Sequence, residues 1–177
     1  MPGFLKHYTD AGRAREALRR TLALRRHGFP TPAAQEGPDP NTLAFDLIKG
    51  RTGRDLIRGT LSPLLKVVSR LHAAKVPDLP TFDPLLRIRP RLALADEPLL
   101  RRVAEGAVPN GRALLHGDLH AGQFIQEPSG EVWLLDLDDL AIGPPEADLA
   151  NFAAHMATTD AGLGVAGWAE QVCRDWA

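Results

Sequence analysis

A short hairpin pattern with a polar cluster at each end is the feature of this 177-residue chain that most restricts its fold. Apolar segments at 124–126 and 131–136 border the turn sequence Pro128-Ser129-Gly130, which is typical of two antiparallel strands. One polar cluster, 116–123, leads into the first strand, and a second, 136–139, follows the second strand. Because a hairpin brings its two ends back together, the sequence predicts that the two polar clusters meet.

The charges of the chain are unevenly distributed. Residues 118–148 carry eight acidic side chains and no lysine or arginine, whereas residues 1–30 carry seven basic side chains against two acidic ones. Each block is compatible with an ordinary solvated face. Acidic side chains in a mostly apolar stretch, however, raise each other's pKa unless a cation lies among them. This asymmetry indicates a metal ion in the C-terminal half.

Three side chains with oxygen atoms are spaced so that they can converge on such a metal. Asp118 lies in the first polar cluster, Gln123 follows five positions later, and Asp136 comes directly after the hairpin. Oxygen ligands of this kind suit Mg²⁺, which is a hard cation. Each short motif is common on its own, so the joint order and spacing carry the information.

Strand and helix patterns both occur along the chain, and we expect an α+β fold. A break at 50–53 divides the chain into a partial N-terminal lobe, 1–50, and a C-terminal lobe, 51–177. The predicted N-terminal elements are a strand at 3–8, a helix at 13–27 and a hairpin at 33–36 and 42–48. The predicted C-terminal elements are a helix capped by Ser62 with Pro63 in its first turn, a helix around 99–107, the 124–136 hairpin, and two closing helices that carry 149–156 and 165–176.

The polar clusters resemble those of one known superfamily. Residues 116–123 resemble the catalytic loop of the aminoglycoside phosphotransferase and choline kinase-like superfamily, usually HGDxHxGN. Residues 134–139 and 143–150 resemble its metal-binding block and the GDPxxDLA motif that follows. The resemblance implies a protein-kinase-like two-lobed α+β fold with a reduced N-terminal β-lobe and a mostly helical C-terminal lobe. It also implies phosphorylation of a small-molecule hydroxyl by ATP and Mg²⁺, the acceptor being aminoglycoside-, choline- or sugar-like.

The match assigns roles residue by residue. Asp118 is implied to be the catalytic base, and Gln123 and Asp136 to be the Mg²⁺ ligands. His116 and Asp148 are implied to support the catalytic loop. The residues implied to bind the nucleotide are Lys6 on the first strand, Glu16 as its helix ion-pair partner, and Asp46, Leu47 and Ile48 at the hinge that borders the adenine.

The sequence departs from the superfamily in three places. Gln123 stands where asparagine is usual, Lys6 has no Gly-rich phosphate loop before it, and the superfamily usually continues into further helices beyond Ala177. Without that loop we expect weak nucleotide affinity and little activity of the monomer. The strand that carries Lys6 would be an edge strand, which favours self-association through that edge.

Two other functions are compatible with the same residues. One is a nucleotide-binding remnant or regulatory pseudokinase whose catalysis is impaired. The other is a metal-dependent hydrolase, because His116, Asp118 and His120 alternate along an extended segment as the ligands of a Zn²⁺ or Mn²⁺ site could. Against the hydrolase, only His155 lies downstream.

Composition limits the partners. No apolar run reaches the length of a membrane span, and the N-terminus lacks an apolar signal core, so no membrane partner and a cytoplasmic location are expected. The single cysteine, Cys173, fits a reducing compartment. The arginine-rich helix lacks interleaved aromatic residues, and the net charge is −1, so no nucleic acid is expected to bind.

Overall fold

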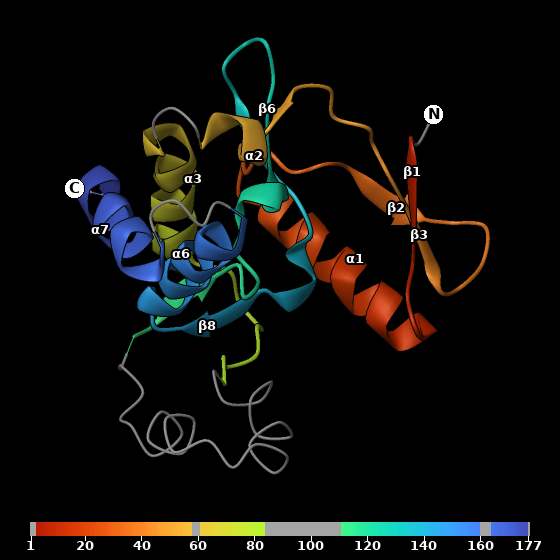
Figure 1. Cartoon of the computed structure of the whole chain (residues 1–177). Coiled ribbons are helices and arrows are strands. Elements are labelled where there is room, and N and C mark those ends of the chain that lie inside the picture. Colours follow the sequence, from red (N-terminus) through yellow and green to blue (C-terminus); the bar gives the residue numbers. More distant parts are fainter. Residues whose placement is uncertain (1–2, 58–60, 84–110, 160–163, 177) are drawn as a thin grey trace, which may run out of the picture.

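Figure 1 shows a computed structural model of the chain, in which residues 3–57, 61–83, 111–159 and 164–176 are described. The N-terminal elements are β1 (Phe4–His7), α1 (Ala11–Arg26), β2 (Ala34–Glu36) and β3 (Thr42–Phe45). The three strands form an antiparallel sheet in the order β1-β3-β2, which confirms the predicted strand and hairpin. Helix α1 packs against this sheet through Ala14 and Ala17, which contact Leu43.

The ends and the buried face of α1 follow from its sequence. Asp10 precedes the helix and its carboxylate accepts the backbone N–H of Arg13 at 2.9 Å, which satisfies one of the free N–H groups of the first turn. Gly28 follows the helix end with φ 74°, a left-handed conformation that favours glycine. The buried positions recur every three or four residues, as in an amphipathic helix, and are Ala14, Ala17, Thr21 and Leu24.

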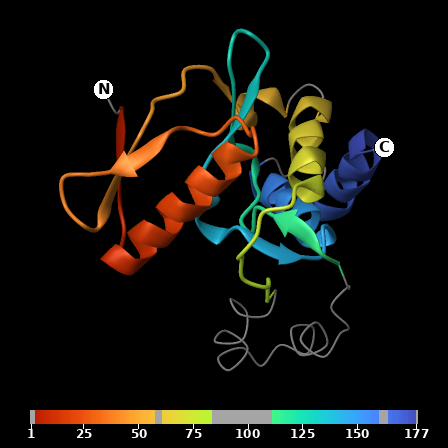
Figure 2. The ribbon, with the colours of Figure 1, turned by 180° about the vertical axis from the view of Figure 1, so that it is seen from behind.

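The C-terminal elements form two small sheets and a group of helices. The sheets have the strand orders β4-β6-β7 and β5-β8. The elements are β4 (Arg51–Thr52), α2 (Gly53–Leu56), α3 (Ser62–Ala73), β5 (Ala113–Leu115), the 3₁₀ turn η1 (Ala121–Gln123), β6 (Phe124–Gln126), β7 (Val132–Leu134), the 3₁₀ turn η2 (Leu137–Asp139), β8 (Ala141–Gly143), α6 (Glu146–Thr159) and α7 (Gly164–Trp176). Figures 1 and 2 show α3, α6 and α7 grouped at one end of the molecule, and α1 with the first sheet at the other.

The larger hydrophobic core lies beneath α3 and joins these elements. Phe124 of β6 meets Phe152 of α6 edge-on with ring centroids 6.3 Å apart, and both rings are fully buried. Trp168 of α7 is buried in the same core, and the ring of Trp176 lies 5.6 Å from that of His72 on α3. Both tryptophans therefore pack within the molecule, as the apolar stripe of the closing helix predicts.

Three element predictions need correction or fall outside the structure. Ser62 is the first residue of α3 rather than its cap, since Leu61 holds the cap position and donates its N–H to Asp175 of α7 at 3.1 Å. The strand predicted at 42–48 ends at Phe45, because the residues that follow leave the sheet. Leu47, for example, is 61% exposed. The helix predicted around 99–107 lies outside the described residues.

Candidate functional site

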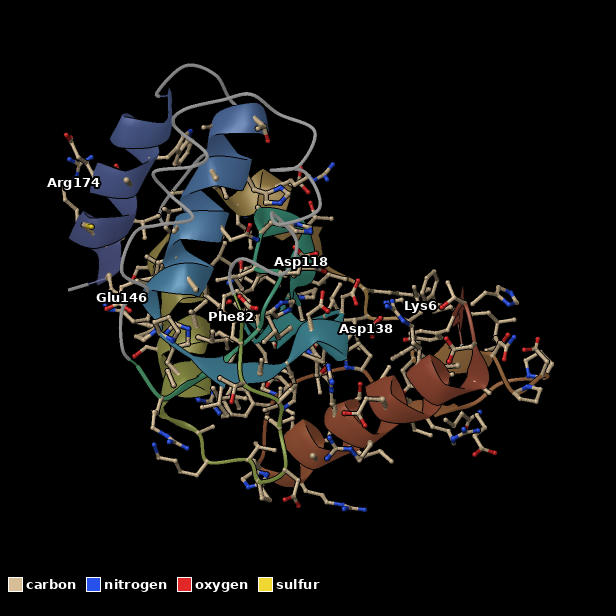
Figure 3. The ribbon with its side chains drawn as sticks, turned by 90° about the horizontal axis from the view of Figure 1, so that it is seen from below. Lys6, Phe82, Asp118, Asp138, Glu146 and Arg174 are labelled. Carbon is tan, nitrogen blue, oxygen red and sulfur yellow. The ribbon has the colours of Figure 1, made fainter. Side chains whose placement is uncertain are left out.

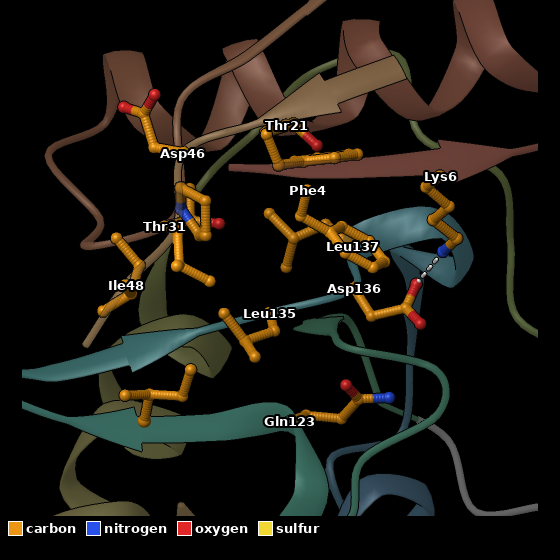
Figure 4. Close-up of a pocket in the computed structure, with 14 residues that line it drawn as sticks. Phe4, Lys6, Thr21, Thr31, Asp46, Ile48, Gln123, Leu135, Asp136 and Leu137 are labelled. Atoms are coloured by element: carbon orange, nitrogen blue, oxygen red, sulfur yellow. Dashed lines mark hydrogen bonds and ion pairs between the residues drawn. The ribbon is translucent and has the colours of Figure 1, made fainter. Parts of the chain in front are cut away.

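A cavity of about 390 Å³ lies between the first sheet and the β6–β7 hairpin (Figure 4). Most of its lining is apolar, but one end presents an ammonium, a carboxylate and a carboxamide. The lining residues are Phe4, Lys6, Thr21, Thr31, Pro32, Phe45, Asp46, Leu47, Ile48, Gln123, Ile125, Leu135, Asp136 and Leu137. A ligand with one flat apolar part and one highly charged part suits this distribution.

The hairpin brings Gln123 and Asp136 to the polar end of the cavity. Strands β6 and β7 pair with Phe124 opposite Leu134, and the N–H of Leu135 donates to the carbonyl of Gln123 at 2.8 Å. The two polar clusters therefore meet, as the hairpin pattern predicts. Asp136 adopts a left-handed backbone conformation, φ 54° and ψ 67°, between β7 and η2. Aspartate tolerates this conformation better than most residues.

Six of the residues predicted to bind ATP or Mg²⁺ line this one cavity. Lys6 comes from β1, residues 46–48 follow β3, and Gln123 and Asp136 flank the hairpin. Figure 4 shows the Lys6 side chain directed at Asp136. Lys6 is more than a hundred positions away from Gln123 and Asp136 in the sequence, so the assembly of the cavity depends on the packing of both groups of elements. Their individual roles stay predictions.

Lys6 is held by two carboxylates of the C-terminal part. Its Nζ lies 2.7 Å from Asp136 Oδ1 and 2.7 Å from Asp138 Oδ2. Burial lowers the pKa of Lys6, but the hydrogen bonds and charges of the two aspartates outweigh burial and raise it above its usual value. The lysine is therefore a permanent cation at the polar end of the cavity.

The predicted ion pair between Lys6 and Glu16 is wrong for this structure. Glu16 binds Arg19 at 2.7 Å and Arg20 at 2.8 Å, which are its neighbours one turn along α1. The hydrogen bond from Arg19 lowers the pKa of Glu16 to about 2, with a further contribution from Arg20. Helix geometry places these arginines beside Glu16, and Glu16 is not among the residues that line the cavity.

The loop that carries Asp118 is anchored by the buried carboxylate of Asp148. Asp148 accepts the backbone N–H groups of His116 at 2.8 Å and Gly117 at 3.0 Å. Gly117 has φ 85°, and a Cβ there would lie 2.2 Å from the carbonyl oxygen of Asp139, so only glycine fits. His116 is fully buried and contacts the Leu135 carbonyl through Nε2 at 2.8 Å. The loop is thus tied to α6 through Asp148 and to the end of the hairpin through His116. In Figure 3, Asp118 lies on the side of the C-terminal elements that is nearer to Asp138 and Lys6.

His72 belongs to the same network and was not predicted as a functional residue. Its Nε2 lies 3.0 Å from Asp148 Oδ2, and the side chains of both residues are almost entirely buried. A single histidine at a helix end is indistinguishable in sequence from an ordinary polar surface residue until its partner is known.

Replacing Asp148 with alanine is expected to destabilise the protein by about 3–5 kcal/mol, because two backbone N–H groups and the His72 ring lose their buried acceptor. Urea unfolding followed by circular dichroism measures this change. The exposed carboxylate of Glu131 provides the control, since Glu131→Gln should change stability by less than about 0.5 kcal/mol. A loss below about 1 kcal/mol for Asp148→Ala would contradict the anchoring role.

The donor set fits a hard divalent cation. Asp136 offers an exposed carboxylate and Gln123 a carboxamide, both at the polar end of the cavity. Gln123 is further constrained by His120, since Gln123 Nε2 lies 3.0 Å from His120 Nε2 while His120 Nδ1 accepts the N–H of Gly122 at 3.0 Å. A neutral imidazole has only one acceptor nitrogen. Because Nδ1 is that acceptor, Nε2 carries the proton, so the carboxamide of Gln123 either accepts from His120 through its oxygen or turns away from His120 to offer that oxygen to a metal.

The structure does not favour the hydrolase. Within residues 3–57, 61–83, 111–159 and 164–176, no group of three histidine, cysteine, aspartate or glutamate side chains could hold a metal ion. Both ring nitrogens of His116 are engaged, with the carbonyl of Leu135 and the N–H of Asp118. Burial, followed by the nearby His155, lowers the pKa of His120 and keeps its ring neutral.

In the described part of the chain, no helix is long and apolar enough to cross a membrane.

Comparison with known proteins connects this geometry to one family. The model of a family described as the phosphotransferase enzyme family matches residues 4–177. None of the curated proteins compared with this chain matches it.

Several solved structures share the fold. The aminoglycoside phosphotransferase APH(3'')-Id of Streptomyces rimosus, solved with ADP and streptomycin, superposes with a TM-score of 0.68 at 19% identity over 97% of this chain and 78% of that protein. An aminoglycoside-3'-phosphotransferase of type VIII superposes with a TM-score of 0.70 at 19% identity, over 97% of this chain and 75% of that protein. The choline kinase LicA of Streptococcus pneumoniae superposes with a TM-score of 0.69 at 15% identity, over 98% of this chain and 66% of that protein. These likenesses confirm the predicted α+β kinase-like fold.

Proposed function

This chain belongs to the phosphotransferase enzyme family, and from that premise we propose that it transfers a phosphoryl group from ATP to a hydroxyl of a small molecule. The observation that carries the proposal is the cavity that joins an apolar lining to a polar end formed by Lys6, Gln123 and Asp136. A purine ring suits the apolar part and a polyphosphate suits the cation at the polar end.

In this proposal the residues of the cavity divide between the parts of the nucleotide. The side chains after β3, residues 46–48, and Leu135 would border the adenine, and Lys6 would neutralise phosphate charge. Asp136 and Gln123 would hold Mg²⁺, which would supply positive charge against the phosphates. The cytoplasm, where ATP is abundant, is the proposed location.

Asp118 is the proposed general base. It lies on the loop that Asp148 anchors, next to the hairpin that presents Asp136. A rigid anchor matters because a base acts only within hydrogen-bond reach of the hydroxyl that it deprotonates. A carboxylate held in this way can orient an acceptor hydroxyl and take its proton.

The acceptor is proposed as a small alcohol of the aminoglycoside, choline or sugar class. The first two classes are named for solved enzymes that share the fold, one of which contains streptomycin and another of which is a choline kinase, and the sugar class comes from the superfamily resemblance.

The proposed function is tested by calorimetry with Mg²⁺-ATP, followed by a screen for ADP formation with one aminoglycoside, choline and neutral sugars. Nucleotide binding with acceptor-dependent ADP release is the expected result. Binding without turnover on any acceptor would favour the nucleotide-binding remnant. Metal-dependent hydrolysis of a substrate, in an assay that contains neither nucleotide nor acceptor, would support the hydrolase.

A second copy of the chain is the proposed occupant of the outer edge of β1, which pairs with no strand among the described residues. Strand β1 lies at the edge of the three-stranded sheet, and Phe4 and Leu5 on it are 54% and 47% exposed. Phe4 also lines the cavity, so a strand added at this edge would cover the nucleotide on that side. Sedimentation velocity should then reveal a dimer, and Leu5→Lys should shift it to monomer and lower specific activity. Equal activity of a strict monomer would contradict this arrangement.

A further inference from the structure

We propose that Asp138 is the positioning residue for Lys6 and takes the part expected of the helix glutamate, Glu16. The proposal rests on the proposed function, in which Lys6 neutralises nucleotide phosphate. Lysine has a long flexible side chain, and its ammonium is effective at a fixed point only if other groups restrain it. The question is therefore which acidic residue restrains Lys6 in this chain.

Both oxygens of the Asp138 carboxylate are used by β1 and the residue that follows it. Oδ2 accepts from Lys6 Nζ at 2.7 Å, and Oδ1 accepts from the hydroxyl of Tyr8 at 3.1 Å. Lys6 and Tyr8 are two positions apart in extended chain, so their side chains lie on the same side. Figure 3 shows Lys6 and Asp138 as neighbours. Burial, and then Asp138, raise the pKa of Tyr8, so its hydroxyl stays a donor.

Glu16 is linked to this part of the site only indirectly. It binds Arg19 and Arg20, and Arg20 in turn donates through Nη1 to the backbone carbonyl of Asp138. The glutamate of α1 therefore restrains the backbone of η2 through an arginine, and within the described residues the ammonium of Lys6 pairs with Asp136 and Asp138 instead of Glu16. The carboxylate that contacts Lys6 directly without being a proposed metal ligand is that of Asp138.

Asp136 also binds Lys6, but its charge is needed elsewhere in the proposed site. A divalent cation bound to Asp136 would offset the attraction between that carboxylate and the ammonium. Asp136 precedes the 3₁₀ turn η2, whereas Asp138 lies two residues further along, within that turn, and is directed at β1. It can hold Lys6 whether or not Asp136 binds a metal. The turn thereby fixes the metal ligand and the lysine relative to each other.

The experiment compares Asp138→Ala, Asp138→Asn, Tyr8→Phe and Glu16→Gln, with Glu131→Gln as an exposed control. The first readout is acetylation of Lys6, followed by mass spectrometry in the absence of nucleotide and metal. Its rate reports how firmly the side chain is held and needs no enzymatic activity. The second readout is kcat and KM for ATP with an active acceptor.

We expect Lys6 to be labelled at least about 5-fold faster in Asp138→Ala, and kcat/KM for ATP to fall about 10–100-fold, as for loss of a charge-assisted hydrogen bond. Asp138→Asn should lie between Asp138→Ala and the wild type, because the amide oxygen still accepts. Glu16→Gln should change both readouts less than about 3-fold, because Arg20 keeps its bond to the carbonyl. Wild-type melting temperature in Asp138→Asn and Tyr8→Phe excludes general unfolding.

Two outcomes would overturn the proposal. One is faster labelling of Lys6 in Glu16→Gln than in Asp138→Ala, which would return the role to the glutamate. The other is unchanged labelling in Asp138→Asn, Asp138→Ala and Tyr8→Phe alike. If no acceptor supports turnover, the proposed function fails, while the labelling result still decides which carboxylate holds Lys6. If Asp138→Ala does not fold, Asp138→Asn and Tyr8→Phe decide in its place.

Discussion

Replacing Asp118 with asparagine is expected to lower turnover about 10²–10⁴-fold while nucleotide affinity changes by less than about 3-fold. Asparagine keeps the shape of the side chain but cannot accept the proton of the acceptor hydroxyl. The change should leave the fold intact, since Asp148 holds the backbone of this loop at His116 and Gly117. Steady-state kinetics with an acceptor found by screening, together with calorimetry on Mg²⁺-ATP, measures both quantities.

The same assays on Glu131→Gln control for loss of a carboxylate, because Glu131 is exposed beside the turn of the β6–β7 hairpin. Turnover of Asp118→Asn equal to that of the wild type would remove Asp118 from the role of base. A fall in affinity as large as the fall in turnover would instead indicate that Asp118 contributes to the binding of nucleotide or metal.

Replacing Asp136 with alanine is expected to abolish the Mg²⁺-dependent part of nucleotide binding. Asp136 is the charged member of the proposed ligand pair, and a hard cation loses most when an anionic oxygen is removed. Calorimetry with ADP in excess Mg²⁺ and in EDTA separates the metal-dependent part from the remainder. The same change also frees Lys6 from one of its two carboxylates, so binding of metal-free ADP should persist or become tighter.

Gln123→Asn is the comparison variant and should be tolerated better than Asp136→Ala. Asparagine preserves the amide oxygen on a shorter arm, but it should also lose the contact with His120 Nε2. Undiminished Mg²⁺ dependence in Asp136→Ala would contradict the assignment of this residue. A bound metal located on His116 and His120 would point to the hydrolase.

Local sequence patterns were sufficient for much of the fold and for the meeting of the two polar clusters. The β6–β7 hairpin, α1 and the two closing helices follow from periodicity and turn residues, which act between neighbours in the chain. Gln123 and Asp136 border the hairpin, whose register pairs Phe124 with Leu134, so the hairpin alone brings them together. Asp118 lies in the loop before η1, and the resemblance of residues 116–123 to a known catalytic loop was needed to assign its role.

Contacts between distant segments were beyond the reach of the same patterns. Glu16 could face either Lys6 or its own helix, and the spacing of Arg19 and Arg20 decides this only when the competition with a distant lysine is known. Asp138 was indistinguishable from a solvated acid until β1 was placed beside η2. The link between His72 and Asp148 likewise joins helices that are far apart in the sequence.

The contacts of Lys6 with Asp136 and Asp138 also determine at what stage of folding the candidate site can form. Lys6 is separated from Asp136 by 130 positions and from Asp138 by 132 positions. Contacts of such high sequence separation close large loops and tend to form late in folding. On the ribosome, the first sheet can pair its own strands as soon as they emerge, but its lysine lacks its carboxylate partners until η2 has been synthesised. Nucleotide binding by this chain would therefore be a sensitive reporter of completed folding during translation.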